Sequence, residues 1–276
     1  MDHVLSTHLF VNHRLTTVWL EKIWQARIPA VEIFCARQHL DYRDKAQIKE
    51  LGHWFRDSEL KLNSLHAPMY TDKIWGRSGP HAVISITERV KGRRLEMVDE
   101  IKRALDIAEE IPFRYLIQHL GVSGEEYSDA ALDAAFAALE DISLFARHRG
   151  VEVLLENTQN ALASAERLQY FLGLTHLNLN FCFDVGHANM NEGVEPAFRL
   201  MEKRIRSTHL HDNNGREDQH LFPLGSDGGV IDWKSTIGLL RTHPEQYPLV
   251  LELKELPELA NTIEAAGALF EKLETL

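Results

Sequence analysis

The chain has 276 residues, of which 44% are hydrophobic and 26% are charged, a balance typical of a globular protein with a sizeable core. Lys and Arg number 30 against 41 for Asp and Glu, so the formal net charge is −11, which disfavours nonspecific binding to nucleic acid or to an anionic membrane. The chain has two cysteines, no secretory signal at its start and no apolar run of membrane-spanning length. We therefore expect a cytoplasmic protein with reduced thiols.

Short apolar runs typical of buried strands recur along the whole chain. We expect eight of them, at residues 3–7, 30–34, 61–66, 114–119, 151–156, 179–184, 205–211 and 248–254. Amphipathic stretches lie between them. Residues 93–111 repeat apolar side chains at helical spacing, residues 128–150 open on a Ser128/Asp129 cap signal, and residues 257–276 have the pattern of a terminal helix.

Eight strand–helix units in 276 residues predict an α/β fold of the (β/α)8 TIM-barrel type, in one domain that spans residues 1–276. The alternative is a doubly wound open sheet, but no glycine-rich dinucleotide or phosphate motif follows the first strand. The connection at residues 67–92 is long, and connections of this length are usually functional or disordered. Because it follows the third strand, it would lie at the catalytic face of a barrel.

Polar side chains that can bind metal stand at the ends of the later strands, which share one mouth in a barrel. They are His66, His119, Glu156, Asp184, His187, His209, His211, Asp212 and Glu252. Taken singly, each could be a helix cap, a salt-bridge partner or a hydrogen-bonded core residue. Several carboxylates cannot converge in a mouth of low dielectric without a compensating cation, and mixed carboxylate and imidazole ligands suit zinc, manganese, iron or cobalt. Asp184 and His187, in "FDVGHAN" (183–189), are therefore predicted to belong to a metal site.

Five segments resemble the xylose-isomerase-like TIM-barrel superfamily, which holds sugar and sugar-phosphate isomerases and epimerases and also endonuclease IV. They are "SLHAP" (64–68), "LLEN" (154–157), "FCFDVGHANM" (181–190), "THLHDNNGREDQHLFPLGSDGGVIDW" (208–233) and "LVLELK" (249–254). The resemblance covers nearly the whole chain and implies a divalent metal ion (Mn, Mg, Co, Fe or Zn) with no organic cofactor. The implied ligands, one from each of strands five to eight, are Glu156, Asp184, His209 and Glu252.

The endonuclease IV branch binds three zinc ions, and its further ligands also have counterparts here. His66 and His119 match histidines that end strands three and four, His187 matches a histidine after the strand-six aspartate, and Asp218 and His220 match an Asp-x-His pair. His211 is a further candidate for metal or substrate. Many relatives described as sugar phosphate isomerases or epimerases share these positions, so the extra ligands leave isomerase and nuclease open.

The resemblance implies an isomerase or epimerase in which Glu156 and Glu252 move a proton next to a ketose carbonyl, through a metal-stabilised enediolate. Arg216 and Trp75 are the candidate substrate-binding residues, and His187 would orient a substrate oxygen. The expected partner is a small sugar or sugar phosphate. A homo-oligomer is left open. Dehydration of a cyclic polyol or keto-sugar would use the same proton abstraction.

The alternative is an endonuclease IV-like zinc phosphodiesterase acting on abasic DNA. It needs a basic groove, and the dense basic cluster of this chain is "RVKGRR" (89–94), which a solvated helix face also explains. A non-catalytic barrel would not need to keep both Glu156 and Glu252. We therefore expect the isomerase or epimerase and no nucleic-acid partner.

Overall fold

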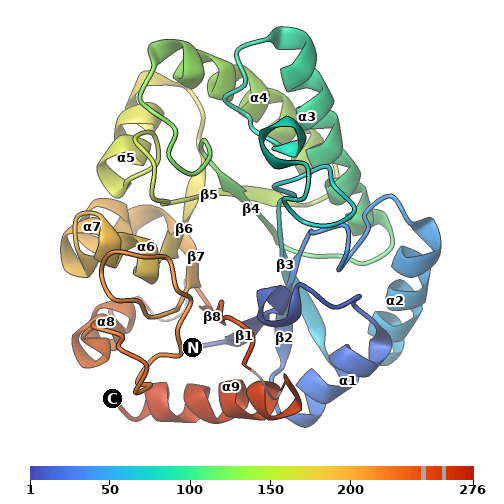
Figure 1. Cartoon of the computed structure of the whole chain (residues 1–276), viewed down its shortest axis with the longest axis vertical. Coiled ribbons are helices and arrows are strands. Elements are labelled where there is room, and N and C mark those ends of the chain that lie inside the picture. The colour runs from blue at the N-terminus through green and yellow to red at the C-terminus, as the bar shows by residue number, and fades with distance from the viewer. Residues whose placement is uncertain (244–246, 257–258) are drawn as a thin grey trace.

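Eight parallel strands form a nearly closed barrel surrounded by helices in a computed structural model, which describes residues 1–243, 247–256 and 259–276 (Figure 1). The strands are β1 (His3–Ser6), β2 (Ala30–Phe34), β3 (Lys61–His66), β4 (Tyr115–His119), β5 (Glu152–Glu156), β6 (Asn180–Asp184), β7 (Ile205–His209) and β8 (Leu249–Leu251). They are hydrogen-bonded in the order β7-β6-β5-β4-β3-β2-β1-β8. The prediction of an α/β (β/α)8 barrel is confirmed.

Helices follow the strands and cover the outside of the barrel (Figure 1). They are α1 (Thr17–Gln25), α2 (Lys45–Asp57), α3 (Lys91–Leu105), α4 (Asp129–Arg147), α5 (Ala165–Leu174), α6 (Val185–Met190), α7 (Val194–Met201), α8 (Trp233–Leu240) and α9 (Leu259–Glu274). Within the described residues, four short 3-10 turns add to them: η1 (Thr7–Phe10), η2 (Gly79–Ala82), η3 (Asp106–Glu109) and η4 (Glu202–Arg204). The expected terminal helix includes residues 257 and 258, which lie outside the described residues.

Side-chain caps fix several helix starts. The Asp44 carboxylate accepts hydrogen bonds from the backbone of the first turn of α2, and the Asp232 carboxylate does the same for α8. The expected helix at 93–111 ends earlier, because the chain tightens into η3 after Leu105. α4 begins where predicted, but the Ser128 side chain makes no capping hydrogen bond there.

The barrel closes between β7 and β8 through a short seam. A single parallel bridge joins Leu210 to Leu251, and the Thr208 hydroxyl donates a hydrogen bond to the Pro248 carbonyl oxygen at 2.7 Å. Both strands are shorter than expected. After Leu210 the chain leaves the barrel wall, because Asp212 pairs with Leu221 in an antiparallel bridge of the β7–α8 loop.

The core has two layers, and the inner one lies below the mouth. Tyr115, Ile117, Leu154 and Cys182 form a buried apolar cluster. Leu154 and Cys182 each stand two residues before a strand-end carboxylate, so they share its face of the sheet. The larger cluster packs the outer face of the strands against the helices. Apolar side chains thus fill the lower barrel, and the polar side chains stand on this floor.

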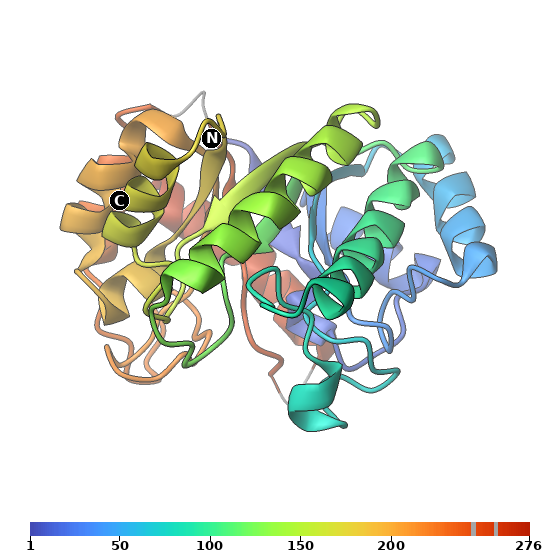
Figure 2. The same cartoon turned by 90° about the horizontal axis from the view of Figure 1, so that it is seen from above.

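The long segment between β3 and α3 has structure of its own. An antiparallel bridge pairs Tyr70 with Val83, and η2 lies between them. Figure 2 shows η2 protruding at the same end of the barrel as the loop after β7. This placement at the carboxyl ends of the strands agrees with the sequence prediction. Among the described residues, no helix is long and apolar enough to cross a membrane.

Candidate metal centre

The strand ends bring acidic and imidazole side chains to one mouth. His66 ends β3, His119 ends β4, Glu156 ends β5, Asp184 ends β6, His209 ends β7, and Glu252 directly follows β8. The parallel register keeps neighbours level, because His119 pairs with Glu156 and Asp184 pairs with His209. All six stand where the sequence predicts them.

Three carboxylates surround one imidazole in what we call the central group: Glu156, Asp184, His209 and Glu252. His209 Nδ1 lies 2.8 Å from Glu252 Oε2, 3.3 Å from Glu156 Oε1 and 3.8 Å from Asp184 Oδ2. The other ring nitrogen, Nε2, lies 3.0 Å from Glu32 Oε1 and donates to it. Nδ1 is therefore the nitrogen left to bind a metal ion.

The central group fits a divalent cation. Asp184 Oδ2 and His209 Nδ1 are buried and have no hydrogen-bond partner among the described residues. Such atoms are rare in folded proteins and call for an ion or a water molecule. Three carboxylates in a dry site also need a compensating positive charge. Three carboxylates and one imidazole suit zinc, manganese, iron, cobalt or magnesium.

A second group lies beside the first and consists of His66, His119 and Glu156. His119 Nε2 is 3.1 Å from His66 Nε2 and 3.2 Å from Glu156 Oε2. His66 Nδ1 donates to the Ala67 carbonyl oxygen at 3.0 Å, which turns Nε2 inward. Glu156 therefore faces both groups, with Oε1 toward His209 and Oε2 toward the two histidines.

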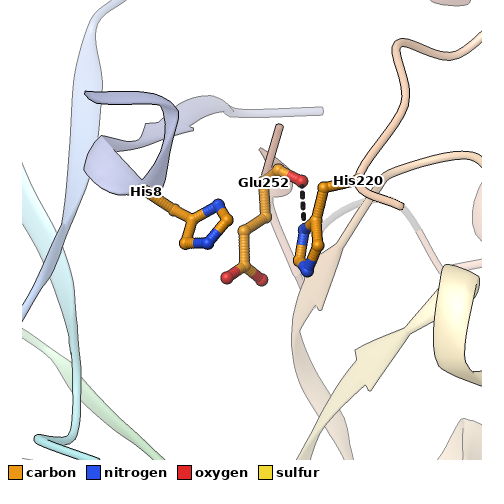
Figure 3. Close-up of side chains that lie close together, drawn as sticks. All are labelled: His8, His220 and Glu252. Carbon is orange, nitrogen blue, oxygen red and sulfur yellow. Dashed lines mark hydrogen bonds between the residues drawn. The ribbon is translucent and has the colours of Figure 1, made fainter. Parts of the chain in front are cut away.

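A third group, which we call the loop group, consists of His187, Asp218 and His220. Asp218 Oδ2 lies 3.3 Å from His187 Nε2, and Asp218 Oδ1 lies 3.2 Å from His220 Nε2. Each imidazole is oriented by its other nitrogen. His187 Nδ1 donates to the Asn157 carbonyl oxygen at 2.9 Å. His220 Nδ1 donates to the Glu252 carbonyl oxygen, also at 2.9 Å (Figure 3). Both Nε2 atoms are thereby aimed at Asp218.

Opposite charges shift the pKa values of these groups strongly. Burial favours the neutral acids, yet the positive charge of His209 outweighs it and holds the pKa of Glu156 and of Glu252 well below the ordinary value. Burial opposes protonation of His220, but its hydrogen bond to Asp218 raises its pKa to about 9. Without a metal ion, the carboxylates hold protons on the imidazoles, so metal uptake would release protons.

A cavity of about 190 Å³ opens over these groups. Phe34, Trp75 and His8 form an aromatic wall, and His8 faces Glu252 and His220 in Figure 3. Trp75, a candidate substrate-binding residue, thus lines the cavity. Arg216 does not line this cavity and is exposed on the β7–α8 loop. Among the described lining residues, none is Lys or Arg.

Two residues of the site are missing from the sequence predictions. Glu32 is fully buried inside β2, and its carboxylate accepts from both His209 and the Ser64 hydroxyl. The sequence did hold a signal for Glu32, because it is a charged residue within the otherwise apolar run "AVEIF" (30–34). His8 lies just beyond β1, in η1, so the strand-end rule would have included it had the first strand been considered.

The sequence profile of the family described as "Xylose isomerase-like TIM barrel" matches residues 23–272. The chain belongs to this family. An uncharacterized protein of Methanocaldococcus jannaschii, MJ1311, is 30% identical in an alignment 236 residues long that covers 80% of this chain and 74% of that protein. This relative supports the family and carries no assigned activity.

Several solved structures share the fold of this chain over its full length. A protein described as D-tagatose 3-epimerase-like is 24% identical with a TM-score of 0.78, covering 100% of this chain and 99% of its own. The IolI protein with a bound zinc atom is 16% identical with a TM-score of 0.76, covering 100% and 97%. Other structures with this fold are described as sugar 3-epimerases. At these identities, the likeness establishes the fold.

Proposed function

We propose that the chain is a divalent-metal-dependent epimerase or isomerase of a small sugar that carries no phosphate. One observation carries the proposal: two buried glutamates, Glu156 at the end of β5 and Glu252 just after β8, line the same cavity and meet at His209 Nδ1. Two carboxylates on either side of a substrate can remove a proton from a carbon and return one to it. The family and the epimerase-like structural neighbours support this chemistry.

The residues of the site would have two roles, which are to hold the metal ion and to transfer protons. A metal ion held by Glu156, Asp184, His209 and Glu252 would act as a Lewis acid that stabilises negative charge on the sugar oxygens. One glutamate takes the proton next to the carbonyl, and the other delivers a proton to the same or the neighbouring carbon. The aromatic side chain of Trp75 packs over the sugar and keeps water out.

The cavity supports the choice of substrate class. Its volume of about 190 Å³ is below the roughly 300–1,000 Å³ of pockets for drug-sized ligands, and it suits a molecule of monosaccharide size. Phosphate sites in proteins usually use Arg, Lys or helix N-termini. Because no Lys or Arg stands among the described lining residues, we propose an unphosphorylated sugar.

Proton exchange in heavy water tests the proposal. Metal-loaded protein is incubated with a panel of free ketoses and their phosphates, and deuterium uptake is followed by NMR. We expect deuterium at a carbon next to the carbonyl of a free ketose, and none in the presence of chelator. Failure to label any sugar with folded, metal-loaded protein would overturn the proposal. Faster labelling of a phosphate ester would overturn the substrate class alone.

A zinc phosphodiesterase is the second candidate, because the three ligand groups together could hold three ions. The basic cluster at residues 89–94 gives it little support. Arg93 pairs with the Glu88 carboxylate at 3.5 Å, Arg94 donates to the Glu88 carbonyl oxygen, and neither lines the cavity. Cleavage of an abasic duplex by the same protein, without labelling of any sugar, would favour the nuclease.

A further inference from the structure

A second cavity adjoins the one over the metal-binding groups. It has a volume of about 370 Å³, and we call it the side cavity, whereas the cavity of about 190 Å³ lined by Glu156 and Glu252 is the mouth cavity. The boundary between them includes Gly121, which has no side chain, and Met69, whose unbranched side chain adapts its shape. The residues that line both cavities are His66, Met69, His119, Gly121 and Ser123.

The segment between β3 and α3 covers both cavities. Its two arms are joined by backbone hydrogen bonds, in which the Ile84 N–H donates to the Met69 carbonyl oxygen and the Thr71 N–H donates to the Ala82 carbonyl oxygen, both at 2.8 Å. Trp75 lines the mouth cavity and Tyr70 lines the side cavity, and their rings meet edge-on with centroids 6.2 Å apart. The segment thus places one aromatic ring in each cavity.

The lining of the side cavity is mostly apolar. Among the described residues that line it, none is Asp, Glu, Lys or Arg, and its ionisable side chains are the two boundary histidines. A charged group bound there would lose its hydration without gaining an opposite charge, whereas an apolar group gains free energy by leaving water. The apolar side chains of the lining include Pro68, Met69, Tyr70, Val83, Ile84 and Val122.

One buried polar group at the side cavity has no partner. Gln118 lines the side cavity and is 6% exposed, and its Nε2 donates to the His119 carbonyl oxygen at 3.0 Å. Its Oε1 is buried and has no hydrogen-bond partner among the described residues. Buried acceptors of this kind are rare and are costly to leave unpaired. A hydroxyl or N–H on a bound molecule would supply the missing donor.

We propose that the substrate is a keto-sugar with an uncharged, apolar substituent of about ring size, which occupies the side cavity while the sugar occupies the mouth cavity. A cavity of about 150 Å³ is enough for benzene, so the side cavity has room for a ring. The substituent is attached away from the carbonyl carbon, which must stay free for proton removal beside it. The inference rests on the proposed function and names the substrate class of the same site.

Binding of paired glycosides tests this without turnover. Methyl and phenyl glycosides of glucose, galactose, mannose and xylose are titrated calorimetrically into the metal-loaded protein. Each pair shares its sugar and differs in the substituent alone. We expect the phenyl glycoside of at least one sugar to bind about 10- to 100-fold more tightly than its methyl partner, because the phenyl ring leaves water. A panel without any such preference would overturn the inference.

Variants of the side cavity locate the phenyl group. Val122 lines this cavity and not the mouth cavity, so Val122→Trp fills the side cavity and should bring the ratio of the two affinities to about one. Tyr70→Ala removes the aromatic contact and should lower the ratio several-fold. Val18→Trp on α1 is the matched control, because Val18 is 61% exposed and lines neither cavity, and it should keep the wild-type ratio. Circular dichroism checks the fold of each variant. A wild-type ratio in folded Val122→Trp would overturn the placement.

Deuterium exchange separates this inference from the proposed function. In heavy water, the phenyl glycoside of a keto-sugar should exchange faster than the methyl glycoside. Exchange into free ketoses without any phenyl preference would overturn the substituent and leave the proposed function standing. A phenyl preference that Val122→Trp abolishes, without exchange in any free or substituted keto-sugar, would support the side cavity as a binding site and overturn the proposed reaction.

Discussion

Glu32 and His209 meet inside the barrel, with Glu32 Oε1 3.0 Å from His209 Nε2 and both side chains 0% exposed. The contact joins β2 to β7 across the interior and decides which nitrogen of His209 faces the central group. Glu32 in turn accepts a hydrogen bond from Ser64 on β3 at 2.8 Å. Two side chains, Glu32 and then Ser64, therefore stand in a hydrogen-bonded chain behind the candidate metal ligand His209.

Substitution of Glu32 should weaken metal binding, although Glu32 is not one of the proposed metal ligands. We expect Glu32→Gln to lower the affinity for zinc or manganese about 10- to 100-fold, because the amide keeps the contact but loses the charge that orients and strengthens His209. Isothermal titration of metal-free protein measures the effect. Ser64→Ala, one step further back, should change the affinity less. Equal affinities for Glu32→Gln and wild type would show that the contact is structural.

Loss of Glu156, a proposed proton-transfer group, should stop turnover while the barrel stays folded. At saturating metal, Glu156→Gln should lower kcat about 10²- to 10⁴-fold, since an amide cannot accept the proton. Circular dichroism checks the fold. Glu152→Gln is the matched control, because Glu152 stands on the same strand at the other end, where Asn180 donates to it. Full activity in Glu156→Gln would remove Glu156 from the reaction.

Metal removal should destabilise the protein. Free metal at 1,000 times its Kd stabilises the folded state by about 4 kcal/mol. For a chain of this size, each kcal/mol shifts Tm by roughly 2–4 °C. We expect EDTA to lower Tm by about 8–16 °C and added zinc or manganese to restore it. EDTA saturated beforehand with zinc controls for effects of the chelator itself. An unchanged Tm after verified metal removal would contradict the assignment of these groups to metal.

His39 should make stability depend on pH. Burial lowers its pKa from 6.5 to about 4, so the folded protein resists protonation that the unfolded chain accepts. Its contribution is fully present above pH 6.5 and is lost as the pH falls toward 4. From pH 7.5 to about pH 5 the loss is about 2 kcal/mol. In urea titrations, His39→Gln should show a pH dependence weaker by this amount. Parallel curves for the two proteins would refute the prediction.

Trp75 should act on substrate binding more than on catalysis. Its ring lies 5.0 Å from Phe34 and 5.9 Å from His8 at the cavity wall, and its backbone N–H is held by Gln38 at 2.9 Å. Trp75→Ala should raise KM about 10-fold for the sugar found by exchange, and Trp75→Phe should raise it less. Trp54→Phe, outside the cavity, is the control. A fall in kcat at constant KM would contradict this role.

The mouth of the barrel could be predicted because its geometry follows from strand order. Parallel strands that close into a barrel all end at the same rim. A histidine or carboxylate at the carboxyl end of a strand can therefore be placed at the mouth from the sequence alone. His119, Glu156 and Asp184 are of this kind. Glu32 is not, because its partner is 177 residues away in sequence and meets it only once β2 and β7 share an interior.

Loop residues could not be placed from the sequence for a different reason. The turn around Arg216 is set by the Asn214 side chain, which accepts the backbone N–H groups of Arg216 and Glu217. Such local hydrogen bonds leave no periodic pattern in the sequence, so the direction of the Arg216 side chain could not be predicted from it. The early end of β7 has a similar cause in the pairing of Asp212 with Leu221.

The seam between β7 and β8 links the order of synthesis to metal binding. Glu252 follows the strand that closes the barrel, whereas Glu156, Asp184 and His209 stand on strands made earlier. A chain leaving the ribosome therefore carries an incomplete central group until its last strand docks. A metal ion bound by the central group would link β8 to β5, β6 and β7, the strands that carry the other three ligands. Metal insertion would then be the last step of folding, and metal-free protein would hold β8 only by its pairing with β1 and the short seam with β7.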